Sequence, residues 1–465
     1  MTPARGGSLF ELLAPWLPDQ RWYAAKGGGL PELSPGGDIR LTPVPGDAGD
    51  GDVAVDVRFV RATTPDGVTV TYQVPLTCRA EPEPGLEHAL IGVVDGRYVY
   101  DGPHDPAFLR ALLRLLADRG EAWSGDGAVF GRARAVRPPG GWAPAPDARA
   151  SVLAGEQSNT SVVVRGDRPM IVKLFRVLAP GDNPDVVIQT SLARAGSTRV
   201  PVPAGWLEGW WPGPDGGVPV RGHLAYACEF LSGSEDAWRV ATRAVAAGES
   251  FAEEARELGA TTAAVHLGLA RALPTRVADP RVLGALADGL LARVDWAVDA
   301  VPALRPYTAA ARARVDAVRT VRGTPDLQQV HGDYHLGQVL HHAERGWIVL
   351  DFEGEPLRPL SERLAPDLAL RDVAGMLRSF DYAARHASLG TDDSDGSAAA
   401  QAWAVQCREA FLDGYGAAVG RDPREDDVLL GALELDKALY EAVYETRNRP
   451  DWAVIPLEAV QRLLG

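Results

Sequence analysis

The segment from His331 to Pro356 constrains this chain most strongly, because it spaces polar groups at fixed intervals around a short apolar run. It contains Asp333 in a polar loop, then Gln338, then the apolar run 347–350 and Asp351 directly after it. A loop carboxylate can accept the proton of an attacking hydroxyl, and amide and carboxylate oxygens are ligands that Mg²⁺ prefers. This order predicts a phosphoryl-transfer site, in which positioning supplies most of the catalysis.

The same residues also have a purely structural interpretation. An aspartate that follows an apolar strand is often a turn or N-cap residue. The combination of a loop carboxylate, an amide, a β-hairpin spacing and a second carboxylate favours the catalytic interpretation. We therefore expect Asp333 to be the general base, and Gln338, Asp351 and Glu353 to be the metal ligands.

Several further segments carry a family resemblance. Together with the catalytic segment they are QRWYAAKG (20–27), EQSNTSVVV (156–164), RDVAGMLRSFDYAA (371–384) and LELDKALYEAVYETRNRPDW (433–452). Taken together, they resemble the maltokinases and their close relatives, bacterial sugar kinases with the fold of aminoglycoside phosphotransferases and protein kinases. The resemblance extends over nearly the whole chain.

The resemblance implies an α+β, bilobal, protein-kinase-like fold with an N-terminal α/β cap domain. The expected division is a cap region over residues 1–148, a nucleotide-binding N-lobe over 149–230 and a mostly helical C-lobe over 231–465. A Pro- and Gly-rich linker, 137–148, separates the cap from the N-lobe. The expected cofactors are ATP and Mg²⁺.

Composition limits the partners. The net charge of −15 argues against nucleic acid or an anionic membrane as the main partner, because binding phosphate-rich surfaces needs a basic face. No long apolar run or signal peptide is visible, so we expect a cytoplasmic protein. Cys78, Cys228 and Cys407 are widely spread, which predicts core thiols and neither disulfides nor a zinc site. We expect a monomer or a homodimer.

Hydrophobic periodicity predicts the main elements. Alternation predicts strands over 53–62 and 68–78, and apolar residues at helical spacing predict helices over 108–120 and 249–273. Trp16, Trp22 and Tyr23 lie beside apolar residues and are expected in the core, although stacking on a sugar is the alternative. His266 is expected to be packed or on the surface, with no catalytic role.

Lys173 ends an apolar strand, as does the lysine that contacts the α- and β-phosphates in kinases. Ser158, Asn159 and Thr160 take the place of a glycine-rich loop and can offer hydroxyls and amides to phosphates. In the maltokinases a glutamate that clamps the lysine is expected where this chain has Val187, so Lys173 is predicted to lack its usual partner. The turn 227–230 is the expected interlobe hinge, where Glu229 and Phe230 bind adenine through the main chain.

The acceptor site is expected on the C-terminal helices. Carboxylates and aromatic rings together suit a sugar, because oxygens fix the hydroxyls and a ring covers the apolar face. The candidate sugar contacts are His335, Glu409, Asp436, Tyr440, Glu445 and Arg447.

Two differences from the maltokinases bear on the choice of sugar. Glu409 stands where a small residue is expected, and Leu433 where an aromatic residue is expected. An added carboxylate favours a cationic acceptor, and loss of a ring removes a stacking surface for a second sugar unit. These changes favour D-glucosamine, converted to its 6-phosphate, with glucose as a weaker substrate.

Three alternatives remain open. The nearest is a maltokinase that makes maltose 1-phosphate for α-glucan synthesis. Another is a catalytically silent nucleotide- or sugar-binding scaffold, which the loss of a glutamate at Val187 favours. An antibiotic phosphotransferase is the third, although the 351–356 and 444–452 segments resemble the sugar kinases more closely.

Overall fold

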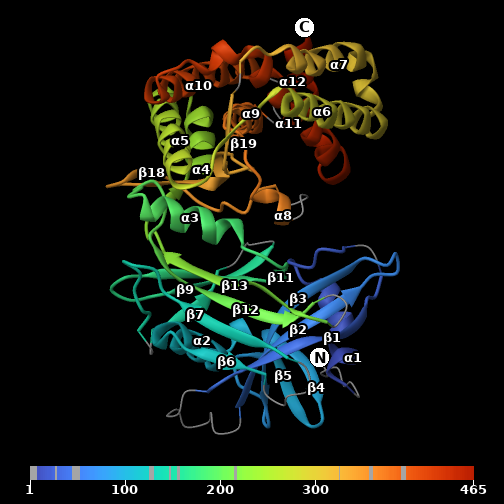
Figure 1. Ribbon diagram of the computed structural model, residues 1–465, viewed down its shortest axis with the longest axis vertical. Coiled ribbons are helices and arrows are strands. Elements are labelled where there is room, and N and C mark those ends of the chain that lie inside the picture. Colours follow the sequence, from blue (N-terminus) through green and yellow to red (C-terminus); the bar gives the residue numbers. More distant parts are fainter. Residues whose placement is uncertain are drawn as a thin grey trace. The chain divides into compact units, whose positions relative to one another are not determined.

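The computed structural model describes residues 8–26, 29–43, 53–124, 130–145, 148–153, 158–213, 217–323, 325–355, 360–388 and 394–465. The chain forms two compact units (Figure 1). The first comprises residues 1–190 and 202–232, and the second comprises 191–201 and 233–465. The predicted division into three parts stays a prediction.

The first unit is built on one large antiparallel sheet. Its strands are β1 (Glu32–Leu41), β2 (Val53–Thr63), β3 (Thr69–Arg79), β4 (Leu90–Val94), β5 (Arg97–Asp101), β6 (Glu121–Trp123), β7 (Arg132–Val136), β8 (Ala150–Val152), β9 (Asn159–Val164), β10 (Met170–Phe175), β11 (Val177–Leu178), β12 (Pro203–Pro212) and β13 (Pro219–Glu229). Their order is β4-β5-β3-β2-β1-β6-β7-β12-β13-β10-β9-β8, and β11 pairs with β3. The strands of the predicted cap and of the predicted N-lobe therefore share one sheet.

Helix α2 (Pro106–Asp118) covers the sheet with an apolar face that includes Phe108, Leu112 and Leu116. It begins where Asp105 accepts a hydrogen bond from the Ala107 amide, and Pro106 fits its first turn. The predicted strands over 53–62 and 68–78 and the helix over 108–120 are confirmed within a few residues.

Helix α1 (Leu9–Trp16) was not predicted. Its residues pack against a second cluster with Trp22, Tyr23 and Tyr72, whose rings contact one another. The prediction of core positions is confirmed for Trp22 and Tyr23, which are buried, and Trp16 is half-buried against the same cluster.

The second unit is mainly helical. Its helices are α4 (Ala237–Ala247), α5 (Ala252–Ala272), α6 (Pro280–Ala300), α7 (Thr308–Asp316), α8 (Leu360–Arg363), α9 (Leu370–Ser388), α10 (Ser394–Val419), α11 (Asp427–Asn448) and α12 (Val454–Leu464). Helix α3 (Pro184–Arg194) begins in the first unit and ends in the second. Small sheets are formed by β14 (Glu235–Asp236), β17 (Val339–His342) and β18 (Gly346–Val349), and by β15 (Arg276–Val277), β16 (Asp326–Gln328) and β19 (Asp367–Leu368).

Helices α5 and α10 lie side by side (Figure 1). Their close approach depends on small residues, because a Cβ at Gly259 would lie 2.1 Å from the Phe411 carbonyl oxygen and one at Gly414 would lie 2.0 Å from that of Arg256. Helix α5 confirms the helix predicted over 249–273. His266 on it is buried, as one of the two expectations for it stated.

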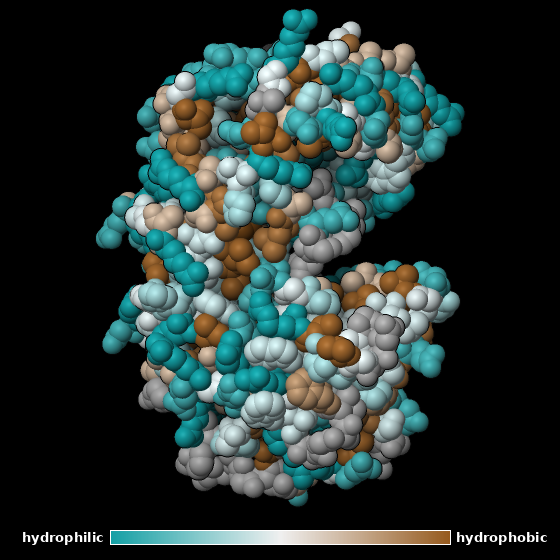
Figure 2. Space-filling view, in the orientation of Figure 1, coloured by the Kyte–Doolittle hydropathy of each residue, from teal (hydrophilic) through white to brown (hydrophobic). Residues whose placement is uncertain are grey.

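Hydrophilic residues cover most of the visible face of both units, and hydrophobic residues form scattered patches (Figure 2). Among the described helices, none is both long and apolar enough to cross a membrane. Cys228 and Cys407 are buried, as predicted, whereas Cys78 is half-buried.

Arg176 ties together segments of the first unit that are far apart in the chain. Its side chain is fully buried. Its Nη2 donates to Asp101 at 3.1 Å, its Nε donates to the Thr160 hydroxyl at 2.8 Å, and its guanidinium lies 4.6 Å from the centre of the Trp22 ring. The carbonyl of Arg176 also accepts a hydrogen bond from the Gln73 amide.

We predict that Arg176→Met lowers the free energy of unfolding by about 3–5 kcal/mol, because it leaves the Asp101 carboxylate without its buried counter-charge. Urea denaturation measures this. The double variant Arg176→Met with Asp101→Asn is the matched control and should recover part of the loss. A single-variant cost below about 1 kcal/mol would contradict this account of the ion pair.

Candidate active site

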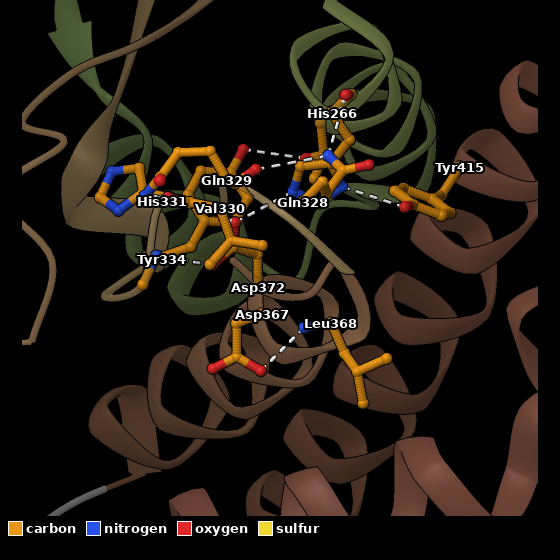
Figure 3. A network of polar contacts seen from close by, with 12 residues as sticks. His266, Gln328, Gln329, Val330, His331, Tyr334, Asp367, Leu368, Asp372 and Tyr415 are labelled. Atoms are coloured by element: carbon orange, nitrogen blue, oxygen red, sulfur yellow. Dashed lines mark hydrogen bonds and ion pairs between the residues drawn. The ribbon is translucent and has the colours of Figure 1, made fainter. Parts of the chain in front are cut away.

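The loop that carries Asp333 is held by a buried carboxylate, Asp372 on α9. Asp372 accepts hydrogen bonds from the main-chain amides of His331 at 2.7 Å and Gly332 at 2.9 Å, and His266 lies 3.0 Å away on its other side (Figure 3). Burial alone raises the pKa of Asp372, but the hydrogen bond and charge of His266 outweigh this effect and lower it. Because a carboxylate only accepts, His266 donates from Nε2, and its Nδ1 pairs with the Tyr415 hydroxyl at 3.0 Å.

His331 fixes the loop from inside. Its Nε2 donates to the Leu350 carbonyl at 2.8 Å, so the loop is tied to the end of β18. Gly332 has a φ of +85°, and a Cβ there would lie 3.3 Å from Gly354 Cα, so glycine suits this close approach. The loop is therefore preorganised by the protein.

Asp333 projects from this loop and pairs with Lys437 on α11. The Lys437 ammonium lies 3.1 Å from Asp333 Oδ1. Burial alone raises the pKa of Asp333, but the charge of Lys437 and a smaller contribution from His335 outweigh it and lower the pKa. Asp333 is therefore held ionised, which is the form that can accept a proton.

Asp333 and Lys437 line a cavity of about 530 Å³ in the second unit. The other residues that line it are Trp238, His335, Gly337, Gly375, Ser379, Tyr382, His386, Tyr440, Glu441, Tyr444, Glu445, Arg449 and Trp452. Helix α11 supplies one wall, since residues 437, 440, 441, 444 and 445 share a face at a spacing of three and four residues. Burial lowers the pKa of His335 to about 4, so its ring is neutral near pH 7.

Two carboxylates of this wall are buried and have positively charged partners. Glu441 Oε2 accepts a hydrogen bond from Nε of Arg378 at 2.9 Å and forms an ion pair with Nη2 of the same arginine at 2.8 Å. Glu445 accepts from Arg449 through both oxygens, at 2.8 and 2.6 Å, and from the Tyr382 hydroxyl at 3.3 Å. The cavity therefore presents carboxylate oxygens whose charges are compensated from behind or from the rim.

Aromatic rings line another side of the cavity. The rings of Tyr382 and His386 both stack on Trp452, with centroids 6.3 and 5.3 Å away, and Trp238 lies 5.7 Å from His386. Flat rings beside carboxylates form a site suited to a polar ligand with one apolar face.

The β17–β18 hairpin brings the predicted metal ligands to one end. Val339 pairs with Val349, and the Leu350 amide donates to the Gln338 carbonyl at 2.9 Å. Gln338, just before β17, and Asp351, just after Leu350, therefore lie at the same end of the hairpin. Asp351 has a φ of 60°, and such positive values are uncommon outside glycine and gather at functional sites. Carboxylate oxygens of Asp351 and Glu353 lie within 4.8 Å of each other. This all-oxygen set has the chemistry that Mg²⁺ requires.

The first unit holds the predicted phosphate lysine. Lys173 lies in β10, and its ammonium lies 3.2 Å from the buried carboxylate of Asp185 in α3. The usual glutamate is absent at Val187, as predicted, but Lys173 is not left without a partner, because Asp185 pairs with it. The acid stands one place after the start of α3 at Asp185, and Gln189 one turn further along the helix contacts the same carboxylate.

The predicted hinge needs a correction. Residues 227–229 belong to strand β13, where Ala227 pairs with Val172. The amides of Glu229 and Phe230 donate to the carbonyls of Val202 and Pro169, at 2.9 and 3.0 Å. These two N–H groups are thus already engaged, and the Phe230 carbonyl accepts a hydrogen bond from the Ser232 amide at 3.0 Å.

The predicted phosphate loop is described in part. Glu156 and Gln157 lie outside the described residues. Asn159 and Thr160 begin β9, and the Asn159 amide donates to the Ser158 hydroxyl at 3.3 Å. The Thr160 hydroxyl is bound by Arg176, which gives it a structural partner.

The predicted sugar contacts divide into two groups. His335, Tyr440 and Glu445 line the same cavity as Asp333. Glu409, Asp436 and Arg447 are absent from its described lining. Glu409 is largely exposed and pairs with Arg424, Asp436 pairs with Arg371 and Arg293, and Arg447 lies over Trp296.

The expectation for Glu409 fails because the spacing on α10 says nothing about which face of the helix meets the loop. Trp403 and Cys407 turn inward, and Trp403 packs against Phe251. Sequence reasoning also missed Lys437 and the aromatic group around Trp452. The spacing of 437, 441 and 445 on one helix face was the available signal.

Comparisons with known proteins agree with this architecture. Residues 149–427 match the model of the phosphotransferase enzyme family, and residues 16–105 match the maltokinase N-terminal cap domain. The chain therefore belongs to the phosphotransferase enzyme family. It is a kinase of the α+β, protein-kinase-like type that carries an N-terminal maltokinase cap, as the sequence predicted.

Named relatives are glucosamine kinases. The chain is 33% identical over 323 residues to that of Streptacidiphilus jiangxiensis, covering 65% of this chain and 70% of the relative. It is 29% identical over 326 residues to that of Mycolicibacterium smegmatis, covering 66% and 78%. A solved structure of a glucosamine kinase in complex with glucosamine, ADP and inorganic phosphate is 26% identical, with a TM-score of 0.66 over 100% of both chains.

We predict that Asp372→Asn lowers the free energy of unfolding by about 1–3 kcal/mol, because an amide cannot satisfy all of the donors that meet at this buried carboxylate. The pKa of Asp372 is lowered by folding, so the difference from the native protein should be full above about pH 4 and shrink only as the pH falls further. Urea denaturation at several pH values measures it. A difference that grows toward acid pH would contradict the assignment.

Proposed function

We propose that the protein transfers the γ-phosphate of ATP to a sugar hydroxyl, and that D-glucosamine is its substrate and D-glucosamine 6-phosphate its product. The observation that carries this proposal is the cavity beside Asp333. A carboxylate held ionised by Lys437 lies at one end, and the carboxylates of Glu441 and Glu445 lie further along the same wall. An amino sugar matches that order of groups, and glucosamine is the sugar bound by the solved relative.

In this mechanism Asp333 accepts the proton of the acceptor hydroxyl as its oxygen attacks the γ-phosphorus. The bond from the γ-phosphorus to the β,γ-bridging oxygen breaks, ADP leaves, and the proton departs later from Asp333 to solvent. Asp372, His331 and Gly332 keep the base in place during these steps. The neutral His335 beside Asp333 can exchange hydrogen bonds with the same sugar hydroxyls.

Gln338, Asp351 and Glu353 would hold Mg²⁺, which neutralises charge on the transferred phosphoryl group. Lys173, oriented by Asp185, would contact the phosphates, with Ser158 and Asn159 offering further donors. The carbonyl groups of Glu229 and Phe230 would meet the adenine amino group.

A second candidate is maltose, phosphorylated at its 1-hydroxyl. The maltokinase N-terminal cap domain over residues 16–105 supports it. The silent-scaffold alternative loses its support, since Lys173 has an acidic partner in Asp185.

We predict that incubation with ATP, Mg²⁺ and each of glucosamine, maltose, glucose and an aminoglycoside gives the highest kcat/KM with glucosamine. Coupled release of ADP measures the rate, and chromatography of the product against glucosamine 6-phosphate identifies the hydroxyl. Preferential turnover of maltose would replace glucosamine by the second candidate. No turnover of any sugar would refute the proposed function.

We predict that Asp333→Asn lowers kcat by about 10²–10⁴-fold, the range that a general base contributes, because the amide cannot accept the hydroxyl proton. Binding of ATP, measured by calorimetry, and the melting temperature serve as controls and should stay close to those of the native protein. Near-native turnover in this variant would remove Asp333 from the role of base.

A further inference from the structure

The cavity wall formed by α11 is electrically polarised. Lys437, Glu441 and Glu445 follow one another at intervals of four residues, so they lie on one helix face about 6 Å apart along the helix axis. All three line the cavity. The cation lies at the Asp333 end and the carboxylates lie away from it.

The two carboxylates differ in what they can still bind. Arg378 approaches Glu441 through Oε2 alone, whereas Arg449 takes both oxygens of Glu445. Glu441 Oε1 is therefore the better placed of the two acids to accept hydrogen bonds from a ligand ammonium.

An amino sugar poses a problem of orientation for a carboxylate base. In glucosamine the 2-amino group and the 6-hydroxyl lie at opposite ends of the sugar ring, because C2 and C5 face each other across it. A carboxylate without a counter-charge attracts an ammonium more strongly than a neutral hydroxyl. The sugar would then bind with its nitrogen at Asp333 and its 6-hydroxyl at the wrong end.

We propose that Lys437 determines the orientation of the amino sugar. Its ammonium neutralises the charge of Asp333 and repels the ammonium of the sugar toward Glu441. This inference rests on the proposed function, since it takes Asp333 as the base and an amino sugar as the acceptor. Lys437 is then a positioning residue for Asp333 and a specificity-determining residue for the sugar. Glucose, which has no ammonium, does not need this control.

The test compares Lys437→Met with Lys437→Arg, using glucosamine and glucose. Loss of Lys437 should lower the rate of phosphorylation of both sugars, because Asp333 loses the ammonium that holds it ionised. For glucosamine alone it should also allow unproductive binding, which lowers kcat and KM by the same factor. We expect the ratio of KM for glucosamine to KM for glucose to fall about tenfold in Lys437→Met, with a parallel fall in the ratio of kcat values, and both ratios to return toward native values in Lys437→Arg.

If a variant turns over too slowly to assay, calorimetry measures the binding of each sugar alone. If Lys437→Met does not fold, Lys437→Gln replaces it. In either variant, glucosamine should bind about tenfold more tightly relative to glucose than it does in the native protein. Unchanged KM, kcat and binding ratios would overturn the inference while leaving the proposed function intact. A native protein that phosphorylates no sugar would instead refute the proposed function itself.

Discussion

The buried carboxylate of Asp372 is the interaction on which the active-site loop depends. It accepts hydrogen bonds from the main-chain amides of His331 and Gly332 at the start of the loop, and His266 contacts it from the other side. A loop of this kind has few ways to satisfy its own amides, and buried amides must be paired. Because the acceptor belongs to helix α9 and its partner to helix α5, the position of Asp333 is set by packed helices and not by the loop itself.

Charge compensation shapes the cavity in the same way. Each acid that lines it has a cationic partner: Asp333 has Lys437, Glu441 has Arg378, and Glu445 has Arg449. Arg378 also donates to Asp381, which in turn binds Arg462 of the last helix, α12. The net charge of the whole chain, −15, therefore says little about this site. Here the pairing of individual charges decides which group of a ligand is stabilised.

The elements and the loop could be predicted from sequence because their signals are local. Alternation located β2 and β3, and the order of Asp333, Gln338 and Asp351 located the catalytic segment. The partners of these residues could not be predicted by the same means. Lys437 meets Asp333 across 104 positions of sequence, and the family pattern placed the partner of Lys173 at Val187, whereas α3 presents Asp185. Glu409 shows the converse, a suitable residue type on the wrong face of its helix.

The polarity of the α11 wall links these observations to selectivity. A carboxylate base strong enough to accept a hydroxyl proton also attracts any cation that enters the cavity, so a kinase for amino sugars must separate these two properties. A fixed ammonium 3.1 Å from the base separates them, because it keeps Asp333 ionised while cancelling much of its attraction for a second cation. Glu441 lies about one helical turn away, and Arg378 contacts it through Oε2 and not through Oε1. The far end of a single sugar ring can reach this carboxylate.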